Sequence, residues 1–158
     1  MNPILLMAES GSDITPEVAQ KYGVTIVPMH VAFGGETRDD GSFPVTEMFA
    51  HYANTRDLPR TSGCTPNDFE TVFDRLQAEH PGQPILHLAY SACTTCSMQS
   101  GVIAADGREG IHFVDTKQVS AAQGAVVIAM AEYLRENPET TIEEAVSKAE
   151  EISGRVRM

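Results

Sequence analysis

Hydroxyl side chains gather in the segments that follow the predicted strands of this chain. At the N-terminus of a helix, such hydroxyls join backbone N–H groups and the helix dipole to form an anion site that needs no cationic side chain. Each hydroxyl taken alone also fits a helix cap or a turn. Their coincidence at two strand ends favours a site for a carboxylate or a phosphate. The residues are Ser10, Ser12, Thr61, Ser62, Thr65, Ser91, Thr94, Thr95 and Ser97.

Residues 93–96, Cys-Thr-Thr-Cys, form a C-x-x-C motif between a predicted strand and a predicted helix. A helix N-terminus lowers the pKa of a thiol and can create a reactive dithiol of the thioredoxin type. The motif does not follow the first strand of its unit, and it lacks the aromatic and proline context of thioredoxins. A dithiol redox protein built on Cys93 and Cys96 is therefore the alternative function rather than the leading one.

A metal centre has little support in the sequence. A structural zinc would need a fourth ligand beside Cys64, Cys93 and Cys96, and none of the five histidines has metal-site spacing. Nucleophile-elbow, phosphate-loop and dinucleotide-binding patterns do not occur either. We expect no metal, no organic cofactor and no catalytic residues.

The remaining candidates for acid–base chemistry have simpler roles. Four aspartates could bind a metal or exchange protons, but their positions at strand ends and before a glycine suit turns and caps better. His87 lies inside an apolar strand, and we expect it to be a satisfied core histidine. The aspartates are Asp13, Asp39, Asp40 and Asp115.

The composition limits the partners of the protein. Its 158 residues include 11 basic and 22 acidic side chains, for a net charge of −11. The basic residues are scattered, which argues against a nucleic-acid surface and against docking on anionic lipid. No apolar run reaches membrane-spanning length, and residues 1–9 lack the basic region of a signal peptide. Three cysteines are too few for a disulfide framework, so we expect reduced thiols and a cytoplasmic protein.

Short apolar runs alternate with stretches of helical spacing, which is typical of an α/β fold. Pro28 cannot donate to a strand ladder, so the second strand is expected to be bent or at an edge. Thr65-Pro66 and the Thr141–Glu144 pair are strong helix starts. The predicted strands cover residues 4–8, 24–33, 85–90 and 111–114, and the predicted helices cover 16–22, 47–53, 66–80, 97–105, 119–134 and 142–156.

Strands joined by helical crossovers predict one domain over residues 1–158, with three α/β/α layers around a mainly parallel sheet. In such sheets, ligands bind outside the carboxyl ends of the strands. We therefore expect the ligand-binding residues in four predicted loops, which are residues 10–13, 34–41, 60–66 and 91–97.

Four motifs at these loops resemble, in order, the N-terminal domain of the DegV family of fatty-acid-binding proteins. The most specific is Leu-Pro-Arg-Thr-Ser, residues 58–62, which stands before the Thr-Pro helix start. The resemblance extends over essentially the whole chain. Its motifs lie in residues 8–14, 27–36, 58–69 and 114–120.

The resemblance implies a binding protein rather than a stand-alone catalyst. Family members enclose one long-chain fatty acid and hold its carboxylate with hydroxyls from two loops, and some present that carboxyl group to a separate fatty acid kinase. The matching positions here are Thr61 and Ser62 in the first loop and Ser91 in the second. The ligand would be the fatty acid itself.

The second loop departs from the family pattern Ser-Ser-Gly-Leu-Ser-Gly-Thr-Tyr-Gln-Ser-Ala. Ala92 removes one hydroxyl, while Thr95 stands where the family has its later serine and can substitute for it. Losing a hydrogen bond to a charged group costs about 1.5–3 kcal/mol, which affects affinity rather than fold. Ser10, Ser12 and Ala92 are further candidates for loop contributions to the site.

The length of the chain is the larger departure. The resemblance implies a second domain that closes over the ligand, and this domain would begin where the sequence stops, at Met158. The chain is expected to be either a truncated piece of a longer protein or a natural one-domain relative. In the first case, the pocket would be half built and apolar surface would be left bare at the missing interface.

Overall fold

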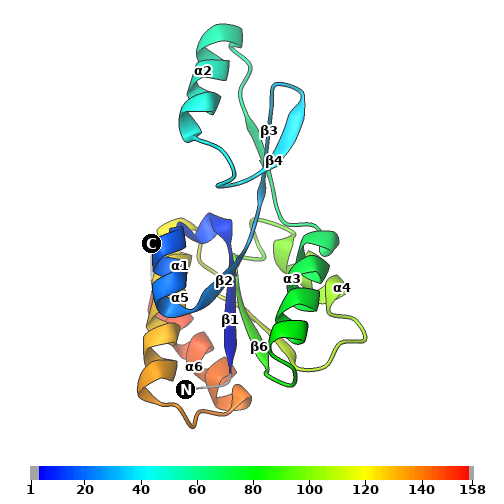
Figure 1. The fold of residues 1–158 in the computed structure, drawn as a ribbon. Helices are drawn as coiled ribbons and strands as arrows, with labels where there is room; N and C mark the ends of the chain where they lie inside the picture. The colour runs from blue at the N-terminus through cyan, green and yellow to red at the C-terminus, as the bar shows by residue number, and fades with distance from the viewer. Residues whose placement is uncertain (1–3, 157–158) are drawn as a thin grey trace.

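The computed structural model describes residues 4–156, and its centre is a four-stranded parallel sheet (Figure 1). The strands are β1 (Leu5–Glu9), β2 (Val24–Val27), β6 (Ile85–Ala89) and β7 (Ile111–Asp115), in the order β2-β1-β6-β7. All three strand pairs are parallel. The prediction of an α/β fold with a mainly parallel sheet is confirmed.

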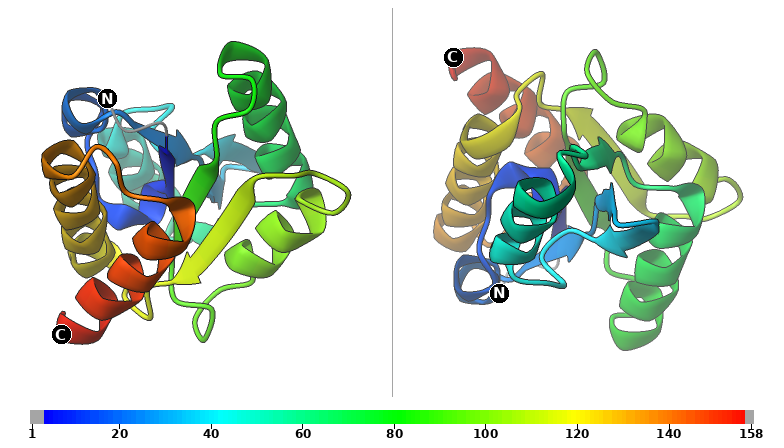
Figure 2. Two further views of the ribbon diagram at one scale, coloured as in Figure 1. Left: turned by 90° about the horizontal axis from the view of Figure 1, so that it is seen from below. Right: turned by 90° about the horizontal axis from the view of Figure 1, so that it is seen from above.

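Helices cover both faces of this sheet and complete three layers (Figure 2). On one face lie α1 (Pro16–Tyr22), α5 (Ser120–Glu136) and α6 (Ile142–Arg155), and the other face carries α3 (Pro66–Glu79) and α4 (Ser97–Ala104). A short 3₁₀ helix, η1 (Ser10–Ser12), follows β1.

The helix starts predicted from the sequence are confirmed by their hydrogen bonds. Thr65 precedes Pro66, its hydroxyl accepts from the Asp68 N–H at 3.4 Å, and its own N–H donates to the Asp68 carboxylate at 2.6 Å. Thr141 and Glu144 form the same reciprocal capping box at α6. These bonds satisfy backbone donors that have no partner inside the helix.

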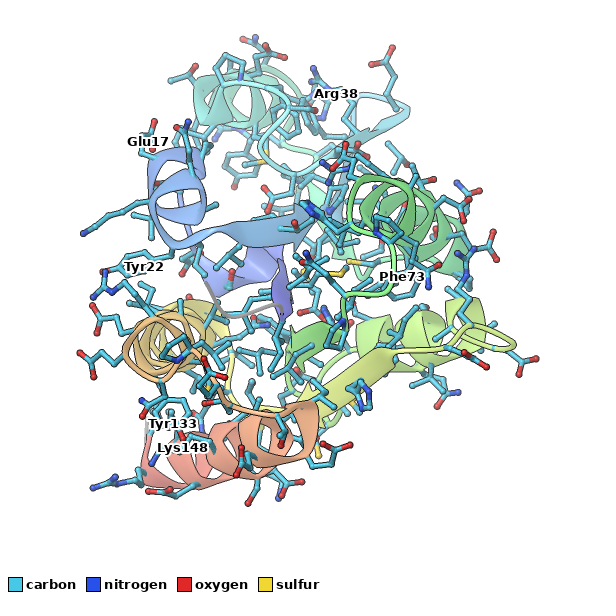
Figure 3. All side chains as sticks on the ribbon, turned by 60° about the horizontal axis from the view of Figure 1, so that its bottom comes forward. Glu17, Tyr22, Arg38, Phe73, Tyr133 and Lys148 are labelled. Carbon is cyan, nitrogen blue, oxygen red and sulfur yellow. The ribbon has the colours of Figure 1, made fainter. Side chains whose placement is uncertain are left out.

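The alternation of side chains along β1 divides the interior into two cores. Leu6 and Ala8 face α5 and α6, while Met7 faces α3 and α4. Four residues of α3 with helical spacing close the second core: Phe69, Val72, Phe73 and Leu76 are all buried, as expected. Figure 3 shows Tyr133 and Lys148 beside each other where α5 packs on α6, with the ammonium 5.2 Å from the ring centre.

A second sheet, which the sequence did not indicate, stands above the carboxyl ends of the parallel strands (Figure 1). It contains β3 (His30–Phe33), β4 (Glu36–Asp39) and β5 (Arg60–Ser62) in the antiparallel order β4-β3-β5. The connection between β4 and β5 carries α2 (Val45–Thr55). We call residues 29–62, which include β3, β4, α2 and β5, the upper unit, and the rest of the described chain the body.

Two sequence predictions are wrong in this region. The single strand expected over residues 24–33 is divided, because Pro28 has no N–H to donate and the chain leaves the parallel sheet after Val27. The loops expected over residues 34–41 and 60–66 contain β4 and β5, whose short polar sequences carry no alternating pattern. The helix expected over residues 47–53 is α2, which is longer at both ends.

Candidate functional site

A cavity of about 640 Å³ opens between the upper unit and the carboxyl ends of the parallel strands. Its floor comes from the segment after β1 and from the residue after β6, and its walls come from β3, β5 and α2. This is the edge of an α/β sheet where ligands are expected to bind. The apolar lining residues are Met29, Val31, Met48, Phe49, Tyr52, Leu58 and Pro59, and the polar ones are Asp13, His30, Asp40, Thr61, Tyr90 and Ser120.

The wall formed by α2 and the segment after it is apolar and unusually exposed. Phe49 is 65% exposed and Leu58 is 67% exposed. No residue of α2 is buried. Burying apolar surface of this kind contributes about 25 cal/mol per Å², so an apolar ligand lying along the wall would gain considerably from it.

The polar end of the cavity has acidic side chains but no lysine or arginine in its lining. Asp13 and Asp40 both line it. Asp13 has a left-handed backbone, with φ of 58°, and its carboxylate accepts a hydrogen bond from the Ser120 hydroxyl. An anion bound here must therefore be held by neutral O–H and N–H donors.

His30 connects the upper unit to the body beside this cavity. Its Nδ1 lies 3.2 Å from the Asp39 carboxylate on β4, and its Nε2 lies 2.7 Å from the Asp68 carboxylate on α3. Burial alone would raise the pKa of Asp68, but hydrogen bonds from Thr65 and the nearby His30 outweigh it and hold that pKa below its usual range. The His30 ring therefore connects β3 to β4 and to α3, and its backbone pairs with β5.

The first predicted hydroxyl pair lies on β5 rather than in a loop. Thr61 pairs with Val31 across the sheet and lines the cavity. Ser62 pairs with His30 and is exposed, but it is not part of the cavity lining. Because neighbouring residues on a strand point to opposite faces, only one of the two can face the cavity directly.

The second predicted loop approaches the first at Gly63. A Cβ atom there would lie 2.5 Å from both the Thr95 Oγ1 and the Ser97 Oγ, so only glycine permits this contact. The Cys64 N–H donates to the Ser97 hydroxyl at 3.0 Å. Thr95 and Ala92 line a separate surface hollow, and Ser91 is buried with its N–H bound to the Gln118 carbonyl.

The two serines of η1 have different surroundings. The Ser10 hydroxyl accepts a hydrogen bond from the Met29 N–H at 3.0 Å, which ties η1 to the start of the upper unit. Ser12 is buried, and its hydroxyl has no hydrogen-bond partner among the described residues. Neither residue lines the cavity.

A buried polar group lies directly beneath the cavity. The Glu9 carboxylate accepts from the Tyr90 N–H at 2.9 Å and the Gln123 amide at 2.8 Å, and lies 3.2 Å from His87 Nε2. Burial alone would raise the pKa of Glu9, but the charge of His87 and these hydrogen bonds lower it further than burial raises it. The structure confirms that His87 is a buried core residue. The expectation that it is fully satisfied is wrong, because neither ring nitrogen has a hydrogen-bond partner among the described residues and only Nε2 lies near the Glu9 carboxylate.

The cysteines offer no support for redox chemistry. Cys64 is buried, and its burial together with the charge of Glu9 raises the pKa of its thiol, which makes it less reactive. Cys93 and Cys96 are exposed and unbonded. Within residues 4–156, no cluster of three or more His, Cys, Asp or Glu side chains could hold a metal ion, and no helix is long and apolar enough to cross a membrane.

Sequence reasoning missed most of the cavity wall. Val45, Met48, Phe49 and Tyr52 have the i, i+3, i+4, i+7 spacing of one helix face, which was the available signal. That pattern normally predicts burial against a core, but here Met48, Phe49 and Tyr52 line an open cavity. No local sequence pattern marked Tyr90 or Ser120 as cavity residues, because contacts between distant parts of the chain bring them to the cavity.

Comparisons with known proteins agree with the geometry. The sequence model of the DegV family, whose members are described as uncharacterised, matches residues 3–158. A DegV domain-containing protein of Caldanaerobacter subterraneus is 26% identical over 159 residues, covering 99% of this chain and 55% of its own length. One from Deinococcus radiodurans is 30% identical over 134 residues, covering 84% and 47%.

A solved structure gives the same fold. A DegV family protein from Thermus thermophilus, described by its fatty acid binding, superposes with a TM-score of 0.84 and is 27% identical, covering 98% of this chain and 54% of its own. The chain thus spans about half the length of the relatives it matches.

Proposed function

The chain belongs to the DegV family, and on that premise we propose that it binds a long-chain fatty acid in the cavity between the upper unit and the body. The observation that carries the proposal is the composition of this cavity, which has an exposed apolar wall and a polar end without lysine or arginine. A fatty acid has the same two parts. The fatty acid binding of the Thermus relative supports the same ligand class.

The proposed carboxylate site consists of Thr61, Ser62, Ser91 and Thr95. Thr61 has the most direct support, because it lines the cavity and its hydroxyl has no other partner among the described residues. Ser62 ends β5, and the segment that follows Ser91 and contains Thr95 contacts the next residue, Gly63. A hydrogen bond to a charged group contributes about 1.5–3 kcal/mol, so several neutral donors can replace one cation.

The tail would lie along the wall formed by Phe49, Tyr52 and Leu58. Each buried methylene contributes about 0.8 kcal/mol, and exposed aromatic side chains of the wall are covered at the same time. Because this wall is open to solvent, the proposal includes a second, closing part of the protein, with residues 1–158 forming the N-terminal domain. The length of the relatives supports that arrangement.

We further propose that the protein acts by binding rather than catalysis, and that it presents the carboxyl group to a separate fatty acid kinase in the cytoplasm. The exposure of part of the proposed carboxylate site supports presentation, because Ser62 and the 92–95 segment at the Gly63 contact remain largely exposed. Three free cysteines support a reducing compartment.

Native mass spectrometry of the delipidated chain with added palmitate tests the proposal. Wild type should gain the mass of one palmitate, and Phe49→Asp should gain none, because a charge on the apolar wall opposes the tail. Glu36→Gln, a polar change in β4 outside the cavity lining, is the matched control and should behave as wild type. Absence of palmitate from the wild type would contradict the proposal.

A further inference from the structure

The polar end of the cavity has few side-chain donors that are available to a ligand. His30 faces two carboxylates, Asp39 and Asp68, and the Ser120 hydroxyl is bound to Asp13. The two lining aspartates repel a carboxylate. Of the side-chain donors that line the cavity, this leaves the Thr61 hydroxyl and the phenols of Tyr52 and Tyr90.

The two phenols lie in different parts of the cavity. Tyr52 belongs to α2, next to Phe49 and the rest of the apolar wall, and its ring lies 5.7 Å from the Arg56 guanidinium. Tyr90 is the first residue after β6, at the carboxyl end of the parallel sheet. Only Tyr90 therefore lies at the edge where the proposed carboxylate site is built.

The body holds Tyr90 in place from two sides. Its N–H donates to the buried Glu9 carboxylate at 2.9 Å, and this carboxylate is fixed in turn by the Gln123 amide. Its ring lies against Gly11, where a Cβ atom would be 3.0 Å from the Tyr90 Cε2 and 2.8 Å from the Met29 sulfur. A residue larger than glycine at position 11 would displace the ring. Gly11 therefore allows the Tyr90 ring to occupy this position.

We propose that the Tyr90 hydroxyl donates a hydrogen bond to the ligand carboxylate as the second neutral donor beside Thr61. This role rests on the proposed function, and it compensates for the hydroxyl that Ala92 cannot supply. A charged carboxylate gains more from this donor than a neutral ester does. Tyr90 is therefore a residue that selects free fatty acids over their esters.

Calorimetric titration of the 158-residue chain with palmitate and with methyl palmitate tests this role. Tyr90→Phe keeps the ring and removes the donor, so palmitate affinity should fall at least about tenfold and methyl palmitate affinity by a clearly smaller factor. Tyr133→Phe, which removes a phenol on α5 outside the cavity lining, is the matched control and should change palmitate affinity less than about twofold. Unchanged thermal unfolding of both variants shows that they remain folded.

The outcomes separate the two proposals. Wild-type binding with an unchanged Tyr90→Phe affinity overturns the role of Tyr90 and leaves the proposed function standing. An equal loss for palmitate and methyl palmitate, or an equal loss in Tyr133→Phe, also overturns it, because the effect would then not depend on a carboxylate at Tyr90. Absence of palmitate binding by the wild type overturns the proposed function itself.

Discussion

The body and the upper unit are stabilised in different ways. In the body, α3 and α5 bury their apolar residues against the sheet, and side chains such as Phe69, Phe73 and Met130 are fully enclosed. In the upper unit, α2 buries none, and large apolar side chains remain in contact with solvent. The body therefore has a closed hydrophobic core, whereas the upper unit exposes apolar surface that a ligand can cover.

Arg38 joins aromatic side chains and α2 within the upper unit, where Phe33 also contacts the rings of Phe43 and His51. The Arg38 guanidinium, labelled in Figure 3, lies 4.5 Å from the Phe33 ring centre and 4.4 Å from that of Phe43. It also pairs with Glu47 on α2 at 2.9 Å. Such contacts contribute about 0.5–1 kcal/mol each at exposed sites, so the unit is expected to open locally more easily than the body.

Histidine–carboxylate pairs occur in both regions and show the same contrast. His87 and Glu9 are both fully buried in the body, while Asp39, a partner of His30, is 57% exposed. Water cannot replace a missing member of a buried pair, so removing one member lowers the free energy of unfolding strongly there and only slightly at the surface.

The largest expected effect comes from truncating one phenylalanine in each region. Phe73→Ala should lower the free energy of unfolding by about 3–5 kcal/mol, because Phe73 is fully buried between Phe69 and Phe113. Phe49→Ala should change it by less than about 0.5 kcal/mol without ligand. Urea denaturation measures both values. Similar losses in the two variants would show that the upper unit has a core of its own.

A smaller effect distinguishes the two kinds of ion pair. Glu9→Gln should cost about 3 kcal/mol at pH 7, and Asp39→Asn less than about 1 kcal/mol. Because the pKa of Glu9 is lower in the folded than in the unfolded chain, its stabilisation is present above the ordinary carboxyl pKa and is lost as pH falls through the folded value. The difference in the free energy of unfolding between wild type and Glu9→Gln should therefore be smaller at pH 3 than at pH 7, and urea denaturation at the two pH values measures it. A difference that stays constant with pH would show that protonation of Glu9 does not change the stability of the wild type.

The sequence predicts the body far better than the upper unit, for physical reasons. Capping at Thr65 and Thr141 and the apolar face of α3 are local patterns, and each leads to one structure. β4 and β5 are short, polar and paired only with β3, so their local sequence carries no strand signal. Pro28 marked a break in the second strand without showing that the chain enters another sheet.

The candidate site was predictable by place but not by shape. The rule that ligands bind at the carboxyl ends of parallel strands indicated the edge at which the cavity opens, and Thr61 lines the cavity there. The hollow itself depends on α2 lying over that edge and on the placement of Tyr90 by Glu9 and Gly11, all of which are long-range contacts. The helical spacing of Met48, Phe49 and Tyr52 was a local signal that the sequence prediction did not use, and this spacing alone could not show that the face lines a cavity.

Amide hydrogen exchange of the chain with and without palmitate tests the central claim that a fatty acid completes the upper unit. We expect palmitate to slow exchange in α2 and β5, where the ligand would cover Phe49 and contact Thr61, and to change exchange in α3 and α6 little. Palmitate binding that leaves α2 and β5 unprotected, or that protects all elements equally, would contradict this account.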